Sequence, residues 1–259
     1  MRHALEEEGF RPAAAVVGEA TGGDVTIGHR GRMELQIRLR GRSGHASVPE
    51  GAVSALRNLP AALFAVDHVA SQLPSDPHLG PATAVATAVR TEPTSRNVVP
   101  DLAVISVDCR TLPHQTPDGV AGKILEVTLD RAGPLGDDEG VEVALAEAPL
   151  EAYTGEGTRW RFHTPGFLMD TEAPLVKAAA EAVGRRNGAG PARTRPWGFA
   201  SDGGWISGAH GIPCVGFAPG DERLAHTNRE RMDLDEFRWC WNRYPEMLRA
   251  LQGSLTEGG

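Results

Sequence analysis

Two kinds of strand pattern divide this sequence, and together they limit how it can fold. Over residues 33–39 apolar side chains alternate with charged or polar ones, which predicts a strand buried on one face only. Residues 13–17 instead form an unbroken apolar run, as in a parallel strand buried on both faces. A second unbroken run, 212–217, lies near the other end of the chain. We therefore expect an open α/β domain that is interrupted by a half-buried sheet.

The interruption has the pattern of a complete module. Apolar residues at helical spacing over 51–73, with a kink expected at Pro60, predict one helix, and residues 118–132 predict a second. Three further strands are expected at 83–90, 102–110 and 141–145. With the alternating strand, the order over residues 30–148 is β-α-β-β-α-β, a ferredoxin-like arrangement.

The flanking segments, residues 1–29 and 149–259, are predicted to be two parts of one α/β domain. Residues 1–9 are predicted to end a helix, and a Gly- and Thr-rich crossing is expected at 153–166. The other predicted elements of the second part are a helix at 170–183, a strand at 214–217 and a helix at 234–251.

Composition excludes several classes of protein. The formal net charge of -8 argues against a nucleic-acid or anionic-membrane partner, because both favour a basic surface. No apolar run approaches the ~18 residues of a membrane span, and the first residues are too acidic for a signal peptide. The three cysteines are far apart, which fits a reducing compartment, so a cytoplasmic protein is expected.

Two candidate metal ligands each follow a predicted buried strand. Glu19 comes just after the run 13–17, and His226 follows the run 212–217 and a Pro-Gly turn. Ligands of open α/β sheets gather beyond the carboxyl ends of strands, and carboxylate together with imidazole suits zinc. The alternatives are a solvated turn glutamate and a hydrogen-bonded loop histidine. The residues themselves leave both interpretations open.

Four further residues are candidates for catalysis or substrate binding. His45, between Gly44 and Ala46, can donate a hydrogen bond to a developing oxyanion, or it can belong to a helix cap region. Asn97 lies between two strands and is otherwise a turn former. Arg110 can hold a substrate carboxylate, or it can pair with Asp108. Glu230 can anchor a cationic group.

In combination these motifs resemble those of the zinc-dependent aminoacylase and metallopeptidase family that includes acetylornithine deacetylase, succinyl-diaminopimelate desuccinylase and carboxypeptidase G. The resemblance runs in order over essentially the whole chain. The matching segments are 17–21, 44–46, 95–100, 108–110, 201–203, 211–213, 219–220 and His226 with Glu230.

The resemblance implies a role for each candidate. Glu19 and His226 match ligands of the family's two zinc ions, for which cobalt or manganese can substitute. His45, on a lid module, matches a histidine that reaches into the partner subunit's active site. Asn97, Arg110 and Glu230 match residues that contact substrate. The implied protein is a homodimer, formed through the lid, that hydrolyses an amide bond of an N-acyl amino acid or short peptide.

One departure from the family is large. The family's first half carries a His-x-Asp motif, a bridging aspartate and a Glu-Glu pair that supplies the general base, and none of these precedes Glu19. Residues 6–8 are three glutamates, but they lie on the helix before the strand, where a solvated face is expected. The resemblance therefore covers the lid and only part of the catalytic domain.

Two hypotheses about function follow. In the first, the chain belongs to a metal-dependent amidohydrolase and is incomplete as written. In the second, it is a non-catalytic remnant that acts as a dimerisation or interaction module. The incomplete sheet also predicts aggregation or dependence on chaperones when the chain is expressed as written, because it would expose strand edges and apolar faces.

Overall fold

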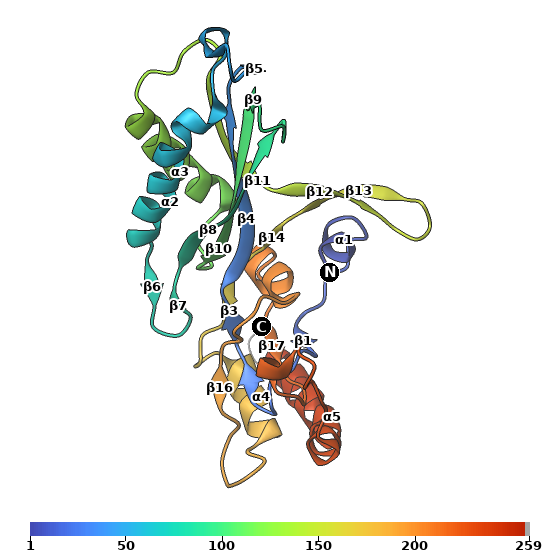
Figure 1. The fold of residues 1–259 in the computed structure, drawn as a ribbon. Coiled ribbons are helices and arrows are strands. Elements are labelled where there is room, and N and C mark those ends of the chain that lie inside the picture. The colour runs from blue at the N-terminus through green and yellow to red at the C-terminus, as the bar shows by residue number, and fades with distance from the viewer. Residues whose placement is uncertain (257–259) are drawn as a thin grey trace. The chain divides into compact units, whose positions relative to one another are not determined.

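The computed structural model describes residues 1–256, whose fold divides into two compact units (Figure 1). The first unit comprises Met1–Gly31, Pro77–Gly80 and the described residues from Thr164 onward. The second comprises Arg32–Asp76 and Pro81–His163. Within the described residues, no helix is both long enough and apolar enough to cross a membrane.

The second unit is built on one sheet covered by two helices. Its main sheet has the order β11-β4-β10-β8. The strands are β4 (Gly31–Arg40), β8 (Thr83–Glu92), β10 (Leu102–Thr111) and β11 (Gly140–Leu145), and the helices are α2 (Leu59–Ser71) and α3 (Pro117–Ala132). Burial alternates along β4, as predicted, and its inward side chains form one core with those of both helices. The element order is therefore β-α-β-β-α-β.

Two details of the second unit differ from the sequence-based expectations. Pro60 lies in the first turn of α2, where its missing N–H costs nothing, so the expected kink is absent. Residues before it form short 3-10 turns instead of helix. The expected crossing at 153–166 is largely a β-hairpin, β12 (Glu147–Glu151) with β13 (Gly157–Arg161). The hairpin is rooted on β4 through backbone hydrogen bonds at Ala146, so the compact unit extends to residue 163 and not 148.

The first unit contains a four-stranded sheet with the order β1-β17-β2-β16. Its strands are β1 (Ala15–Val17), β2 (Val25–Thr26), β16 (Thr194–Arg195) and β17 (Cys214–Gly216). β1 and β17 are parallel neighbours, with Val16 opposite Val215. Both unbroken apolar runs of the sequence are thus adjacent strands of one sheet.

Apolar clusters cover both faces of this sheet. On one face α4 (Pro174–Val183) and α5 (Leu234–Thr256) pack together and against Val215. On the other face lie α1 (Arg2–Glu6) and the π-helical turn η3 (Gly204–Ala209), together with Cys214. Adjacent residues of β17 point to opposite faces, which is why both positions are apolar.

Short elements complete the chain. They are β3 (Gly28–His29) with β15 (Phe167–Leu168), β5 (Gly44–His45) with β9 (Val98–Val99), β6 (Ser75–Asp76) with β7 (Gly80–Pro81), β14 (His163–Thr164), and the 3-10 turns η1 (Pro49–Gly51), η2 (Ala55–Asn58) and η4 (Glu222–Leu224).

A substitution at Gly216 tests the packing that stabilises the sheet of the first unit. A Cβ atom at this position would overlap the Trp197 ring and Thr26 Oγ1, and both residues are buried. We expect Gly216→Ala to lower the free energy of unfolding by about 1–3 kcal/mol in urea titrations, as for overpacked cores. Gly122→Ala, in α3 with open space around the site, is the control and is expected to raise it by up to about 1 kcal/mol. Equal effects of the two substitutions would contradict this packing.

Candidate functional site

The segments that carry Glu19 and His226 both start at the carboxyl ends of strands of the first unit's sheet. These ends lie side by side because β1 and β17 are parallel neighbours. Glu19 follows β1 by two residues, and His226 follows β17 by ten. Thr21 joins the two segments: its buried hydroxyl donates to the carbonyl of Ala218 (2.7 Å) and accepts from the Ala218 amide (3.1 Å). The Gly22 amide adds a hydrogen bond to Gly220 (2.8 Å). Thr21 lies in the matching segment 17–21, but its spacing alone does not indicate this hydrogen-bonding role.

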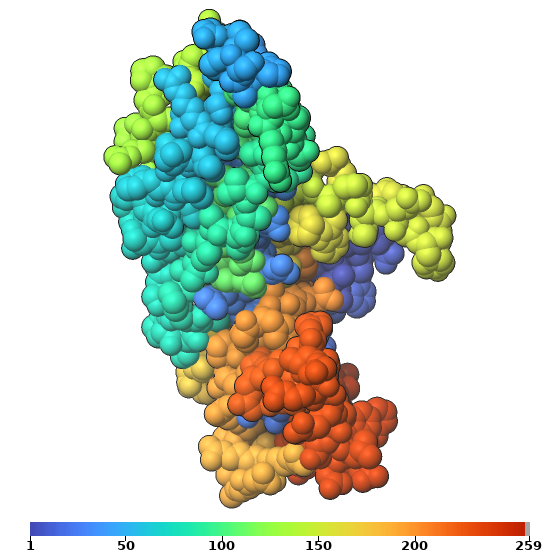
Figure 2. Space-filling model, viewed as in Figure 1, coloured from blue at the N-terminus to red at the C-terminus, as the bar shows by residue number. Residues whose placement is uncertain are grey.

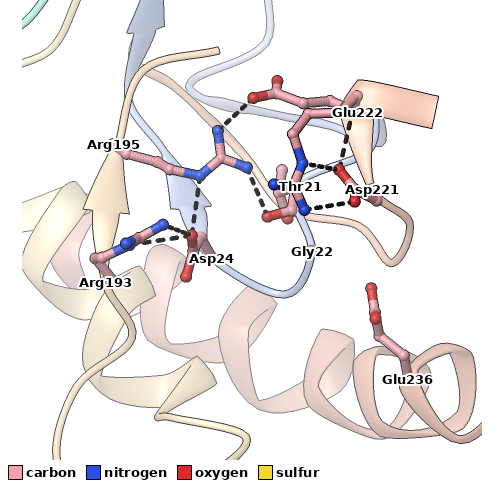
Figure 3. Close-up of a pocket in the computed structure, with 9 residues that line it drawn as sticks. Thr21, Gly22, Asp24, Arg193, Arg195, Asp221, Glu222 and Glu236 are labelled. Atoms are coloured by element: carbon pink, nitrogen blue, oxygen red, sulfur yellow. Dashed lines mark hydrogen bonds and ion pairs between the residues drawn. The ribbon is translucent and has the colours of Figure 1, made fainter. Parts of the chain in front are cut away.

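Arg195 fixes the same two segments from β16 (Figure 3). Its guanidinium donates to Asp24 (2.9 Å), to Glu222 (2.8 Å) and to the backbone carbonyl of Thr21 (2.9 Å). These residues line a cavity of about 470 Å³ whose charged side chains are largely engaged with one another. Arg195 is therefore a structural tie between the Glu19 and His226 segments.

His226 has a strained backbone that Glu230 supports. Among the described residues it is the one non-glycine residue with positive φ, at 62°. Its amide donates to Glu230 Oε2 (2.9 Å), and both side chains are exposed. A left-handed conformation costs on the order of 1 kcal/mol for a residue with a side chain, and such strain clusters at functional sites. In the structure, Glu230 therefore stabilises the backbone conformation of the His226 segment.

Glu19 lies in a different cavity, of about 510 Å³, together with Asp202 and Ile206. Asp202 is within 3.8 Å of the Met1 ammonium group. Within residues 1–256 no three or more His, Cys, Asp or Glu side chains are grouped so that they could hold a metal ion. A zinc site needs about three protein ligands, so the described residues alone do not fit zinc.

In the second unit, the structure brings His45 and Asn97 together. β5 pairs with β9 so that His45 is opposite Val98, and the Ala46 amide donates to the carbonyl of Asn97 (2.9 Å). The Ser47 amide lies 3.2 Å from His45 Nδ1, and the Ser47 hydroxyl 2.6 Å from it. An amide can only donate, so Nδ1 is an acceptor and the neutral ring carries its proton on Nε2. The exposed imidazole therefore presents an N–H donor.

Arg110 is not brought to this pair. It lies near the far end of the ten-residue strand β10, whereas Asn97 precedes the beginning of that strand. At about 3.3 Å per residue, the strand runs for roughly 26 Å from Leu102 to Arg110. Arg110 donates through Nε (2.9 Å) and Nη2 (3.3 Å) to the two carboxylate oxygens of Asp108. The ion pair that the sequence left as an alternative is thus present.

His29 is a fully buried residue that sequence reasoning did not single out as a site residue. The Ser201 amide donates to its Nε2 (3.0 Å), so its Nδ1–H donates to the carbonyl of Arg30 (2.9 Å). The ring packs edge-on against Phe167. His29 therefore fixes the segment that leads into Asp202, on the margin of the Glu19 cavity.

Burial lowers the pKa of His29 below its ordinary value of 6.5. The unfolded chain then takes up the proton first, so the free energy of unfolding is expected to fall as the pH drops below about 6.5. His163 adds to this fall because burial lowers its pKa as well. We expect the pH slope between about 7 and 5 to be smaller in His29→Gln than in the parent chain, measured by urea unfolding at each pH. Identical slopes would contradict a neutral His29 in the folded state.

Comparison with known proteins identifies the class of the second unit. Residues 27–134 match the model of the peptidase dimerisation domain. The resemblance to the zinc-dependent aminoacylase and metallopeptidase family, drawn above from sequence motifs, is confirmed, and the chain is related to that family.

Curated relatives match most of this chain. The Escherichia coli protein YgeY, described as uncharacterized, is 30% identical over 230 residues, which are 89% of this chain and 55% of YgeY. Acetylornithine deacetylase of Myxococcus xanthus is 26% identical over 241 residues, which are 91% of this chain and 57% of the relative. The chain thus spans a little over half the length of these relatives.

Solved structures share the fold. The aminopeptidase PepT of Bacillus cereus superposes with a TM-score of 0.63 at 22% identity, over 98% of this chain and 60% of PepT. A tripeptidase of Staphylococcus aureus gives the same TM-score and identity, over 96% of this chain and 60% of that structure. These peptidases have α/β folds of the same type as the two units described above.

Proposed function

We propose that this chain forms part of a metal-dependent hydrolase that cleaves an amide bond of an N-acyl amino acid or a short peptide. The observation that supports it most directly is the pairing of the Glu19 and His226 segments at one sheet edge, through Thr21 and Ala218. A carboxylate and an imidazole are thereby anchored beyond the carboxyl ends of two adjacent parallel strands. The deacetylase name of one relative supports the amide substrate.

Each of the two units is proposed to have its own role. The first unit is part of the catalytic domain, in which Glu19 and His226 each supply one ligand to the metal centre, zinc in the first instance. The second unit is a ferredoxin-like lid and dimerisation domain. Because the described residues do not complete a metal site, the remaining ligands and the general base have to come from residues that do not belong to this chain's described part.

His45 is proposed as the lid residue that stabilises the oxyanion across a homodimer. The Nε2–H tautomer fixed by Ser47 is the donor that this role requires. Asn97 is proposed to contact substrate beside it, since Ser95 occupies its Oδ1 (2.6 Å) and its NH₂ group remains as a donor.

Arg110 and Glu230 are also proposed to contact substrate. In Arg110, Asp108 occupies Nε and Nη2, and Nη1 remains for a carboxylate. Glu230 has one carboxylate oxygen beyond the one that holds the His226 amide. With its three buried, free cysteines, the protein is proposed to work in the reducing cytoplasm.

One observation favours a second candidate function, that of a non-catalytic dimerisation module. Metal-binding groups of three or more side chains are absent from residues 1–256, although the dimerisation domain is present. In that case the Glu19 and His226 segments would have a structural role and would not bind a metal ion.

A chimera separates the two functions. The matched part of the Myxococcus xanthus acetylornithine deacetylase is replaced by this chain, and bound metal and hydrolysis of N-acyl amino acids and di- and tripeptides are measured. The hydrolase proposal expects bound zinc and hydrolysis that a chelator abolishes and zinc restores. A folded chimera that is dimeric, metal-free and inactive would favour the module.

A further inference from the structure

His45 lies in a loop whose two ends are joined by backbone hydrogen bonds. The Arg42 amide donates to the carbonyl of Val53 (2.7 Å), and the Val53 amide donates to the carbonyl of Arg42 (2.9 Å). Residues 42–53, here called the His45 loop, include β5 and the turn η1. Figure 2 shows this loop in blue at the surface of one end of the second unit. His45 is thus exposed on a loop whose base is closed.

The two arms of the His45 loop are in direct contact. A Cβ atom at Gly44 would lie 2.7 Å from Ala52 Cβ, which is too short for two carbon atoms. At the base of the loop, a Cβ atom at Gly41 would lie 2.1 Å from the carbonyl oxygen of Val53. Gly44 directly precedes His45 in the chain. A shift of Ala52 is therefore transmitted to the backbone of His45.

The side chain of Arg42 fixes the arm that contains Ala52. Its Nε donates to the carbonyl of Gly51 (2.9 Å), the residue before Ala52. Its Nη1 lies 2.8 Å from Asp138 Oδ2, which is outside the loop. The two charged side chains are 52% and 41% exposed, and ion pairs with such exposure contribute little to global stability. We therefore expect this contact to fix the loop and to have little effect on the fold.

Asp138 belongs to a connection that is itself anchored. Residues 133–139 lead from α3 into β11. The neighbouring side chain of Glu139 is only 7% exposed. Its carboxylate accepts from the Gly136 amide (2.8 Å) and from Asn58 Nδ2 (3.3 Å). Asp138 therefore presents its carboxylate from a fixed position.

We propose that Arg42 is a positioning residue, which fixes the His45 loop so that the imidazole keeps one place and one tautomer. It acts through Gly51 and Ala52, not on the ring itself. The consequence for catalysis rests on the proposed function, in which His45 donates to an oxyanion, whereas the effect on the loop does not. A small displacement of a preorganised donor removes much of its effect on the transition state.

Hydrogen exchange tests the loop without any use of hydrolysis. It is measured in the whole 259-residue chain and in the deacetylase chimera. Arg42→Gln is expected to make the Ser47 and Ala52 amides exchange at least about tenfold faster. The acceptors of these amides, His45 Nδ1 and the carbonyl of Pro49, lie in the loop that the substitution releases.

Two further substitutions are the controls for this measurement. Arg40→Gln removes an arginine two positions away that is 58% exposed and lies 4.0 Å from Glu142. It is expected to leave exchange in the His45 loop unchanged. Arg42→Lys is expected to restore much of the protection, because the ammonium group can still donate to the carbonyl of Gly51.

A double-mutant cycle in the chimera tests whether Arg42 acts through His45. Arg42→Gln alone is expected to lower kcat about tenfold with little change in KM, because a displaced oxyanion donor affects the transition state most. In the His45→Ala background the same substitution is expected to cause no further loss. A structural role elsewhere would lower kcat equally in both backgrounds.

Two outcomes would overturn the proposal. One is exchange in the His45 loop that is the same in Arg42→Gln as in Arg40→Gln. The other is an undiminished loss of kcat when Arg42→Gln is added to His45→Ala. If the chimera has no activity at all, the proposed function fails, and the exchange measurement still decides whether Arg42 fixes the loop.

Discussion

Glu19→Gln and His226→Asn, made in the deacetylase chimera, are each expected to lower metal affinity by at least about 100-fold and to remove chelator-sensitive hydrolysis. Loss of an outer-sphere partner already costs about 10–100-fold, and loss of a direct ligand costs more. The two residues come from segments 207 positions apart (226 minus 19) that Thr21 and Arg195 tie together.

The measurement is metal content after dialysis against a graded chelator, alongside hydrolysis rates. Glu230→Gln is the matched control, since the glutamine oxygen can still accept from the His226 amide. It is expected to retain metal and to change mainly KM. Full metal content in both ligand variants would remove Glu19 and His226 from the metal centre.

His45→Ala, in the same chimera, is expected to lower kcat by about 10²–10³-fold with little change in KM. Loss of one preorganised oxyanion donor has an effect of this size. The Ser47 amide fixes the proton of the neutral ring on Nε2, so the donor is set before substrate binds. Ser47→Ala is expected to have a much smaller effect, because the Ser47 amide still donates to Nδ1.

Mixing two inactive variants tests whether His45 acts across the dimer. In a heterodimer of His45→Ala and His226→Asn protomers, one site keeps both its own metal ligand and the partner subunit's lid histidine. Random association would then restore roughly a quarter of the parent activity. If His45 serves its own chain, every site lacks one of the two residues and mixing restores nothing.

Much of the fold could be predicted because it follows from local periodicity. The alternation along residues 33–39 predicts a strand with one buried face and one more exposed face. The structure shows that pattern in β4. The run 13–17 has no such alternation, and its unbroken apolar pattern predicts a strand with apolar neighbours on both faces. Pro60 was misjudged because sequence spacing does not show where a helix begins, and a proline is harmless in the first turn.

The candidate site could be predicted in part. Motif order singled out Glu19, His226, His45 and Asn97. The structure brings the first two segments to the carboxyl ends of two adjacent strands, and it brings the last two residues together where β5 pairs with β9. Arg110 illustrates the limit. A guanidinium two residues from a carboxylate can bind it or a ligand, and only the fold shows that it binds Asp108.

The sequence by itself determined the types of most of the longer elements, the chemistry of the reactive side chains and the relation to the amidohydrolase family, since these depend on residue identity and spacing. Tertiary structure alone decided which groups meet. Thr21 bonding to Ala218, the ring of His29 accepting from Ser201, and the left-handed backbone of His226 held by Glu230 connect residues through folding. Such contacts arise between residues that are neighbours only in three dimensions, so no local sequence pattern encodes them.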